Sequence, residues 1–247
     1  MSNLLKSGVE PPRCLELLDT TCITAVNSNL PPNIPSFHPK PHLFFKLSGS
    51  STTIPATQKS LIQILKSAGG TDLRVAKTPE EGEALWDIRK NLLYYLISMF
   101  PGSAVIGTDA CVPVSRLAGL IEQYKMDQER INGDIEKEGT EGNEALKGRK
   151  LASLIVGHIG DGNFHSLMYF WSTPLNFFYF KNLGLTNYRA YEKGNEALKQ
   201  KAQELETSVV MNAIALDGTC SGEHGVGIHK IVPRPSAYIP RGRHTNR

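Results

Sequence analysis

Two histidines enclose a glycine-rich turn, and this stretch limits the possible folds more than any other. It reads Gly-His-Ile-Gly-Asp-Gly-Asn-Phe-His from 157 to 165, after an apolar run at 151–156 typical of a buried strand. Positions seven apart on an unbroken strand face opposite sides, so the imidazoles converge only if the chain turns or bulges between them. A helix would lose about 0.8–1.0 kcal/mol at each glycine. We therefore expect a strand that bulges or turns at the glycines.

A second glycine-dense loop reads Gly-Thr-Cys-Ser-Gly-Glu-His-Gly-Val-Gly from 218 to 227. Its Glu223 joins His158 and His165 in a set of three ligands that leaves room for water or substrate. Two neutral imidazoles and one carboxylate are typical of a catalytic divalent-metal site, here for Zn²⁺ or Mn²⁺. His224 would lie beside the metal as a base. The alternative is a group of buried polar residues that bond the amides of the glycine loops.

Both loops resemble the two signature loops of the C-terminal domain of FAD-linked oxidases of the vanillyl-alcohol oxidase type. Within that family they are most similar to the D-lactate dehydrogenase (cytochrome) branch, and the resemblance covers most of 12–230. It implies an α+β fold in which helices cover one face of an antiparallel sheet, as in a ferredoxin-like substrate domain. The alternation of predicted strands and helices fits this class.

The resemblance also implies an activity. An enzyme of this family would oxidise a D-2-hydroxy acid, D-lactate to pyruvate or another acid such as glycolate, and pass electrons through FAD to cytochrome c in mitochondria. FAD would be held mainly by a separate N-terminal domain, whose diphosphate-binding loops nothing in this sequence resembles. We therefore expect a truncated chain. Two alternatives stay open: an inactive fragment that keeps its metal ligands, and a metal-dependent hydrolase.

Further site residues follow from the resemblance. Arg89 lies in a segment similar to the family's Leu-Trp-x-x-Arg, whose arginine binds the substrate carboxylate, a contact suited to a planar guanidinium. The alternative is a solvated helix cation paired with Glu81 or Asp87. Asn163 would orient substrate or flavin, or else bond the backbone of its own turn. His224 would accept the hydroxyl proton next to the flavin.

Two aspartates have simpler interpretations. Asp161, between two glycines, is expected to form the turn, because aspartate bonds its own backbone readily. Asp109 begins a segment similar to the family's Asp-x-x-Val-Pro. Relatives that act on hydroxyglutarate carry a lysine just before this position, where this chain has Gly107 and Thr108. That difference favours a smaller acid.

Composition excludes several classes of function. Lys and Arg exceed Asp and Glu by only three, and no basic stripe is interleaved with aromatics, so we expect neither nucleic acid nor an anionic membrane as a partner. No apolar run is long enough for a transmembrane helix. The four cysteines lack paired spacing, which favours a reducing compartment. Residues 1–12 show no targeting pattern.

The expected organisation is a disordered lead at 1–12, the domain at 13–230 and an unstructured, atypical tail at 231–247. Insertions are expected near 126–149, as a helix broken by glycines, and near 170–188, where an aromatic-rich composition departs from the family and suggests a translated intron. The sequence predicts strands at 14–19, 42–47, 73–76, 103–112, 151–156 and 165–169, and helices ending near 26 and at 57–68, 78–100, 114–125 and 191–217.

Overall fold

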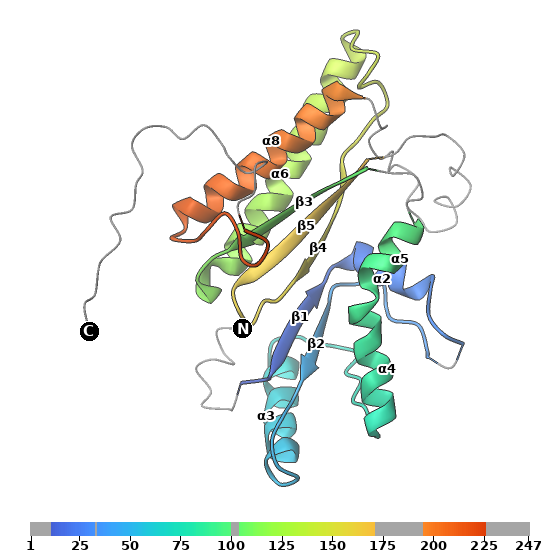
Figure 1. Ribbon diagram of the computed structural model, residues 1–247, viewed down its shortest axis with the longest axis vertical. Coiled ribbons are helices and arrows are strands. Elements are labelled where there is room, and N and C mark those ends of the chain that lie inside the picture. Colours follow the sequence, from blue (N-terminus) through green and yellow to red (C-terminus); the bar gives the residue numbers. More distant parts are fainter. Residues whose placement is uncertain (1–10, 33, 100–103, 171–194, 226–247) are drawn as a thin grey trace, which may run out of the picture.

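The computed structural model describes residues 11–32, 34–99, 104–170 and 195–225 (Figure 1). Its strands are β1 (Cys14–Leu18), β2 (His42–Lys46), β3 (Ala104–Cys111), β4 (Ala152–Gly157) and β5 (Asn163–Phe170). Its helices are α2 (Thr20–Asn27), α3 (Thr53–Ser67), α4 (Pro79–Lys90), α5 (Leu92–Met99), α6 (Val114–Thr140) and α8 (Glu196–Ala215).

The strands form one antiparallel sheet in the order β2-β1-β4-β5-β3. On β5, His165 lies opposite Val156 of β4 and opposite Asp109 of β3. β1 reaches β4 only at its end, where Leu17 lies opposite Gly157. Residues that lie opposite each other in antiparallel strands share a face, so this register lines up polar side chains from several strands on one face.

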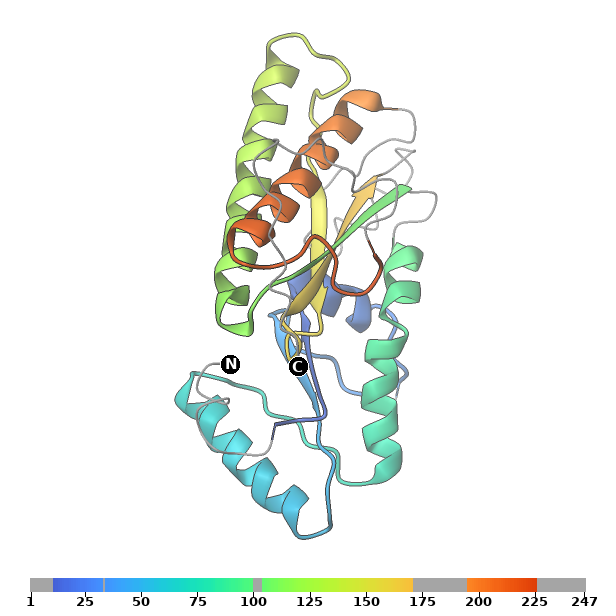
Figure 2. The ribbon, with the colours of Figure 1, turned by 60° about the vertical axis from the view of Figure 1, so that its left-hand side comes forward.

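Helices cover both faces of the sheet (Figure 2). On β4, Ile155 belongs to an apolar cluster with α6 and α8, whereas Leu154 and Val156 belong to a second cluster with α2 and α5. The predicted α+β class and antiparallel sheet are confirmed. Helices pack on both faces of the sheet and not only on the one that we expected, because β4 presents apolar side chains on both of its faces and each face is buried by helices.

The predicted insertion at 126–149 is a regular helix over most of its length, so the expected break at Gly133 and Gly139 is wrong, although the helix ends just before Gly142. α6 continues through Gly133 and Gly139, and each glycine costs a helix about 0.8–1.0 kcal/mol relative to Ala. Ile131 and Ile135 are fully buried in the cluster shared with α8, and burial of each stabilises the fold by about 1.5–3 kcal/mol. The tertiary burial therefore outweighs the local propensity.

Other boundaries also differ. Residues 73–76 are not a strand, and the helix predicted at 78–100 is interrupted at Asn91 between α4 and α5. Residues 171–188 of the second expected insertion, most of the expected lead and the whole expected tail lie outside the described residues. Among the described helices, none has the length and apolar character needed to cross a bilayer.

Candidate metal and substrate site

The two histidines converge through a tight hairpin rather than a bulge. β4 ends at Gly157 and β5 begins at Asn163, and the N–H of Asp161 donates to the His158 carbonyl at 2.9 Å inside the turn. Gly162 has a φ of +79°, and a Cβ there would overlap the Val112 carbonyl oxygen, so only glycine fits. The rings of His158 and His165 lie 5.5 Å apart between centroids.

A buried carboxylate holds the second glycine-rich loop against this hairpin. Asp109, 2% exposed on β3, accepts hydrogen bonds from the Ser221 hydroxyl at 3.1 Å and from the backbone N–H groups of Gly222, Glu223 (3.0 Å) and His224 (2.9 Å). Three successive N–H groups therefore point at one side chain. This contact determines where Glu223 and His224 lie.

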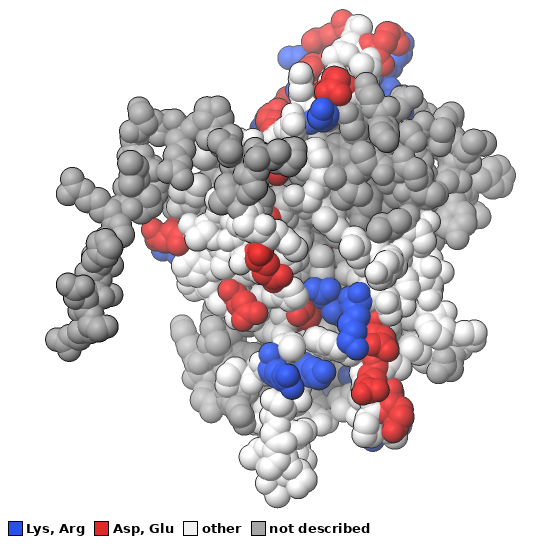
Figure 3. Space-filling model, in the orientation of Figure 1, with Lys and Arg blue, Asp and Glu red and all other residues white. Residues whose placement is uncertain are grey.

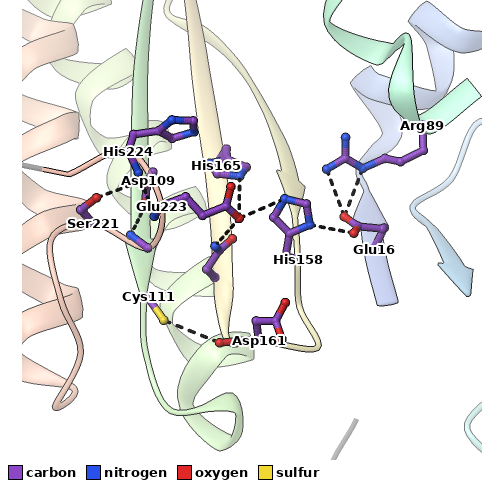
Figure 4. Close-up of polar contacts among 12 residues, drawn as sticks. Glu16, Arg89, Asp109, Cys111, His158, Asp161, His165, Ser221, Glu223 and His224 are labelled. Atoms are coloured by element: carbon purple, nitrogen blue, oxygen red, sulfur yellow. Dashed lines mark hydrogen bonds and ion pairs between the residues drawn. The ribbon is translucent and has the colours of Figure 1, made fainter. Parts of the chain in front are cut away.

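Glu223 reaches both histidines (Figure 4). Its Oε1 lies 3.1 Å from Nε2 of His158 and 4.0 Å from Nε2 of His165, and it accepts a hydrogen bond from Nδ2 of Asn163 at 2.9 Å. A Cβ on Gly222 would come within 2.7 Å of the Asn163 amide. The glycine therefore allows the loop to approach closely enough for the carboxylate to join the imidazoles.

The protonation states in this cluster differ because the environments differ. Burial lowers the pKa of His165, so its imidazole is neutral at pH 7. The hydrogen bond from Asn163 is the main cause of a lowered pKa at Glu223, which is therefore ionised. The hydrogen bond to Glu16 raises the pKa of His158. A neutral imidazole beside an ionised carboxylate is a suitable starting state for cation binding.

The donor set fits a divalent cation. One ligand atom each from His158, His165 and Glu223 lies within 4.8 Å of the others, and the Glu223 oxygen lies 3.1 and 4.0 Å from the two imidazole nitrogens. These two distances are short enough for an ion about 2.0–2.2 Å from each donor. The Oδ1 of Asn163 is buried and has no hydrogen-bond partner among the described residues, which leaves an acceptor unused beside the cluster. The fit is thus good for the mixed nitrogen and oxygen set that the sequence predicted.

A second group of possible ligands meets the same distance criterion but fits less well. It consists of Asp109, His165 and His224, and the rings of the two histidines lie 5.3 Å apart. The Asp109 oxygens already accept the hydrogen bonds of the loop. A cation there would have to displace these bonds. His224 itself is exposed at the rim of the cluster, close enough to act on a molecule bound there.

Arg89 is neither solvated nor paired with the acids expected from the sequence. Its Nε and Nη2 both lie 3.1 Å from Oε2 of Glu16, and the side chains are 18% and 6% exposed. Asp87 pairs instead with Lys90 at 2.7 Å, so the alternative in which Arg89 is a solvated cation paired with Glu81 or Asp87 is wrong. Sequence reasoning missed Glu16. The available signal was one acid in the apolar strand Cys-Leu-Glu-Leu-Leu.

Comparison with known proteins identifies the family of this chain. The family described as FAD linked oxidases, C-terminal domain, matches residues 1–235. The chain belongs to this family. Its members are oxidoreductases that work with FAD, and the resemblance carried by the two glycine-rich loops is confirmed.

The names of curated relatives of this FAD-linked oxidase domain refer to small hydroxy acids. The mitochondrial D-lactate dehydrogenase [cytochrome] of Arabidopsis thaliana is 30% identical over 227 residues, which are 92% of this chain and 32% of the relative. A probable mitochondrial D-lactate dehydrogenase of Danio rerio is 29% identical over 92% of this chain and 37% of its own length. The glycolate oxidase subunit GlcD of Escherichia coli is 25% identical over 94% and 38%. The chain spans about a third of the length of these relatives.

Figure 4 relates the predicted site residues of the FAD-linked oxidase domain to one another. His158, His165, Glu223 and Asn163 meet in one cluster, with His224 at its edge. Arg89 is connected to the cluster through Glu16, which also contacts His158. The roles assigned to these residues stay predictions.

Proposed function

We propose that this chain is the substrate- and metal-binding part of a flavin-dependent D-2-hydroxy acid dehydrogenase that converts D-lactate to pyruvate. Electrons would pass through FAD to cytochrome c, and the enzyme would work in mitochondria. Support comes from the FAD-linked oxidase family and from the names of the relatives. The observation that carries the proposal is the juxtaposition of the His158, His165 and Glu223 cluster with the Arg89 guanidinium.

The cluster and the arginine suit the two functional groups of a 2-hydroxy acid. Arg89 binds the carboxylate, and its Nη1 has no hydrogen-bond partner among the described residues, so both N–H groups of Nη1 remain for substrate. When bound, a Zn²⁺ or Mn²⁺ ion held by His158, His165 and Glu223 supplies the positive charge that makes the 2-hydroxyl more acidic, and FAD supplies the hydride acceptor. Substrate would thus be held at both ends.

The remaining residues handle the proton and the orientation of substrate. A ring nitrogen of His224 takes the proton of the 2-hydroxyl, a role that fits its exposed position 5.3 Å from the His165 ring. Asn163 keeps Glu223 in place through Nδ2, and its buried, unused Oδ1 accepts a hydrogen bond from substrate or flavin. Both residues lie at the cofactor side of the site in this proposal.

Mixed surface charge is in keeping with a small anionic substrate rather than a polyanion. Acidic and basic side chains both occur, in small separate groups, on the described part of the face in Figure 3. The anion-binding capacity therefore belongs to the site itself, to Arg89 and a bound cation. Glycolate is a second substrate to consider, because the glycolate oxidase subunit of Escherichia coli is a relative. Glycolate differs from lactate only by the absence of a methyl group.

The test is a binding titration. Zn²⁺-loaded protein is titrated calorimetrically with D-lactate, L-lactate, glycolate and D-2-hydroxyglutarate, and a preparation that carries FAD is monitored for bleaching of the flavin band. We expect D-lactate to bind and to bleach the flavin, and glycolate to bind more weakly. Binding of none of these acids to the metal-loaded protein would contradict the proposal.

A further inference from the structure

Glu16 divides its two carboxylate oxygens between two different partners. Oε1 lies 2.7 Å from Nδ1 of His158, and Oε2 accepts from Nε and Nη2 of Arg89 at 3.1 Å. The residue is only 5% exposed. A buried carboxylate is stable only when its oxygens are satisfied, so both contacts are needed to keep this charge inside the protein.

The first contact decides which nitrogen of His158 can bind a cation. An ionised carboxylate only accepts hydrogen bonds. The Glu16 oxygen lies 2.7 Å from Nδ1 of His158, closer than the Glu223 oxygen lies to Nε2 at 3.1 Å, so the single hydrogen of the neutral ring belongs on Nδ1. In the neutral ring the lone pair then lies on Nε2, the atom 3.1 Å from Glu223. In many metal sites a carboxylate accepts a hydrogen bond from one ring nitrogen of a histidine, and this contact orients the other ring nitrogen for metal binding. Glu16 and His158 have the same arrangement.

The second contact decides how the guanidinium is presented. Two N–H groups of Arg89 converge on one oxygen of Glu16, which fixes the plane of the guanidinium. Figure 4 shows the resulting row of side chains, with Glu16 between Arg89 and His158 and His158 followed by Glu223. The arginine comes from α4 and the histidine from the turn that follows β4, and Glu16 on β1 is the residue that both contact.

We infer that Glu16 is a positioning residue that sets the tautomer of His158 and the orientation of Arg89 together, so that one buried carboxylate prepares both the metal side and the carboxylate side of the site. This inference rests on the proposed function. Glu16 touches neither substrate nor metal. Its removal should therefore weaken the binding of both, although the ligands themselves remain.

Glu16→Gln is the appropriate variant, because glutamine keeps the shape but offers one acceptor oxygen where two donors, His158 and Arg89, require one each. Asp87→Asn is the matched control. It also removes one negative charge, from the same helix as Arg89, but its carboxylate contacts Lys90 on the surface. The two variants thus separate the loss of charge from the loss of the shared contact.

The experiment measures Zn²⁺ affinity by competition with a chromophoric chelator, and then D-lactate affinity of the Zn²⁺-saturated proteins. In Glu16→Gln we expect Zn²⁺ affinity to fall by about 10- to 100-fold, with weaker D-lactate binding. In Asp87→Asn both should stay within about twofold, since exposed ion pairs contribute little. Equal Zn²⁺ affinity in wild type and Glu16→Gln, or equal losses in both variants, would overturn the inference alone. Failure of wild type to bind Zn²⁺ would overturn the proposed metal site and this inference with it.

A measurement on the unmodified protein guards against a variant that fails to fold. Nitrogen-15 spectra of the imidazole groups in metal-free wild type, at a pH where His158 is neutral, report its tautomer directly. We expect the form with hydrogen on Nδ1, because the contact of Nδ1 with Glu16 at 2.7 Å is shorter than that of Nε2 with Glu223 at 3.1 Å. A ring that carries its hydrogen on Nε2 would overturn the role of Glu16, whatever its variants do.

Discussion

Asp109 lies directly opposite His165 in the β3–β5 pair, and its carboxylate anchors the loop that places Glu223 beside that histidine. Asp109 is 2% exposed and accepts hydrogen bonds from three successive backbone N–H groups and from one hydroxyl. One buried side chain therefore joins a strand to a loop that is more than a hundred residues away in the sequence. The geometry of the candidate metal site depends on it.

Replacement of Asp109 by Asn should weaken metal binding without removing a predicted ligand. The amide offers one acceptor oxygen and places an NH₂ group against backbone donors, so the loop loses part of its anchor. We expect Zn²⁺ affinity to fall about tenfold or more. Asp161→Asn, in the exposed hairpin turn, is the control and should bind Zn²⁺ normally. An Asp109→Asn protein that binds Zn²⁺ as tightly as wild type would show that the loop does not need this anchor.

Metal affinity should depend on pH through His158. Its hydrogen bond with Glu16 raises its pKa above 6.5, and the proton on Nε2 competes with a cation for the same lone pair. Affinity should therefore rise as pH rises through this raised pKa and then level off. Below it, the loss should be about tenfold per pH unit for one displaced proton. Zn²⁺ competition titrations between about pH 6 and 8.5 provide the measurement, and a flat profile would count against His158 as a ligand.

Arg89 should matter more for the acid than for the cation, which it affects only through Glu16. Arg89→Met removes a charge-assisted contact, each worth about 1.5–3 kcal/mol, so D-lactate affinity of the Zn²⁺-loaded protein should fall about 10- to 100-fold. Lys90→Met is the control, because Lys90 is exposed and pairs with Asp87 one turn away. Calorimetric titration with D-lactate measures both. If the two variants bind D-lactate alike, Arg89 is only a partner for Glu16.

His224 should matter for turnover and not for metal. In a preparation that carries FAD, His224→Gln removes the proposed base, and the rate of D-lactate oxidation should fall about 10²- to 10⁴-fold. Zn²⁺ content should stay normal, because the lone pairs of the ligand set come from other residues. Dye reduction and elemental analysis on the same sample separate the two effects. A His224→Gln protein with an empty metal site would reverse the roles of Glu223 and His224, and one with a normal rate would show that His224 is not the base.

The sequence predicted the contacts between the two glycine-rich loops, including those of Glu223 with the histidines, but not the contacts made by single residues on other strands. His158 and His165 lie in one hairpin, so their glycine spacing alone was enough to predict that they converge. Glu16 contacts His158 across 142 positions, a contact that exists only because β1 pairs with the end of β4. No local pattern encodes that pairing. The same holds for Asp109, which appeared as part of a short motif but acts on a distant loop.

Helix α6 shows the same limit of local sequence patterns for the fold. Gly133 and Gly139 predicted a broken helix, and local propensity supports that view. The helix persists because Ile131 and Ile135 are buried against α8, a partner that lies some seventy residues further along the chain. Strand and helix positions were thus predictable where the local sequence alone determines the structure. They were not predictable where packing against a distant segment determines it.

The most direct test of the account is a Zn²⁺ titration of wild type, His165→Ala and His224→Ala. These two histidines have rings 5.3 Å apart and lie in the same cluster, but only His165 belongs to the ligand set with His158 and Glu223 that we propose. We predict about one tightly bound Zn²⁺ per chain in wild type and in His224→Ala, and loss of that site in His165→Ala. Tight binding that survives in His165→Ala, or that is lost in His224→Ala alone, would contradict the proposed metal site.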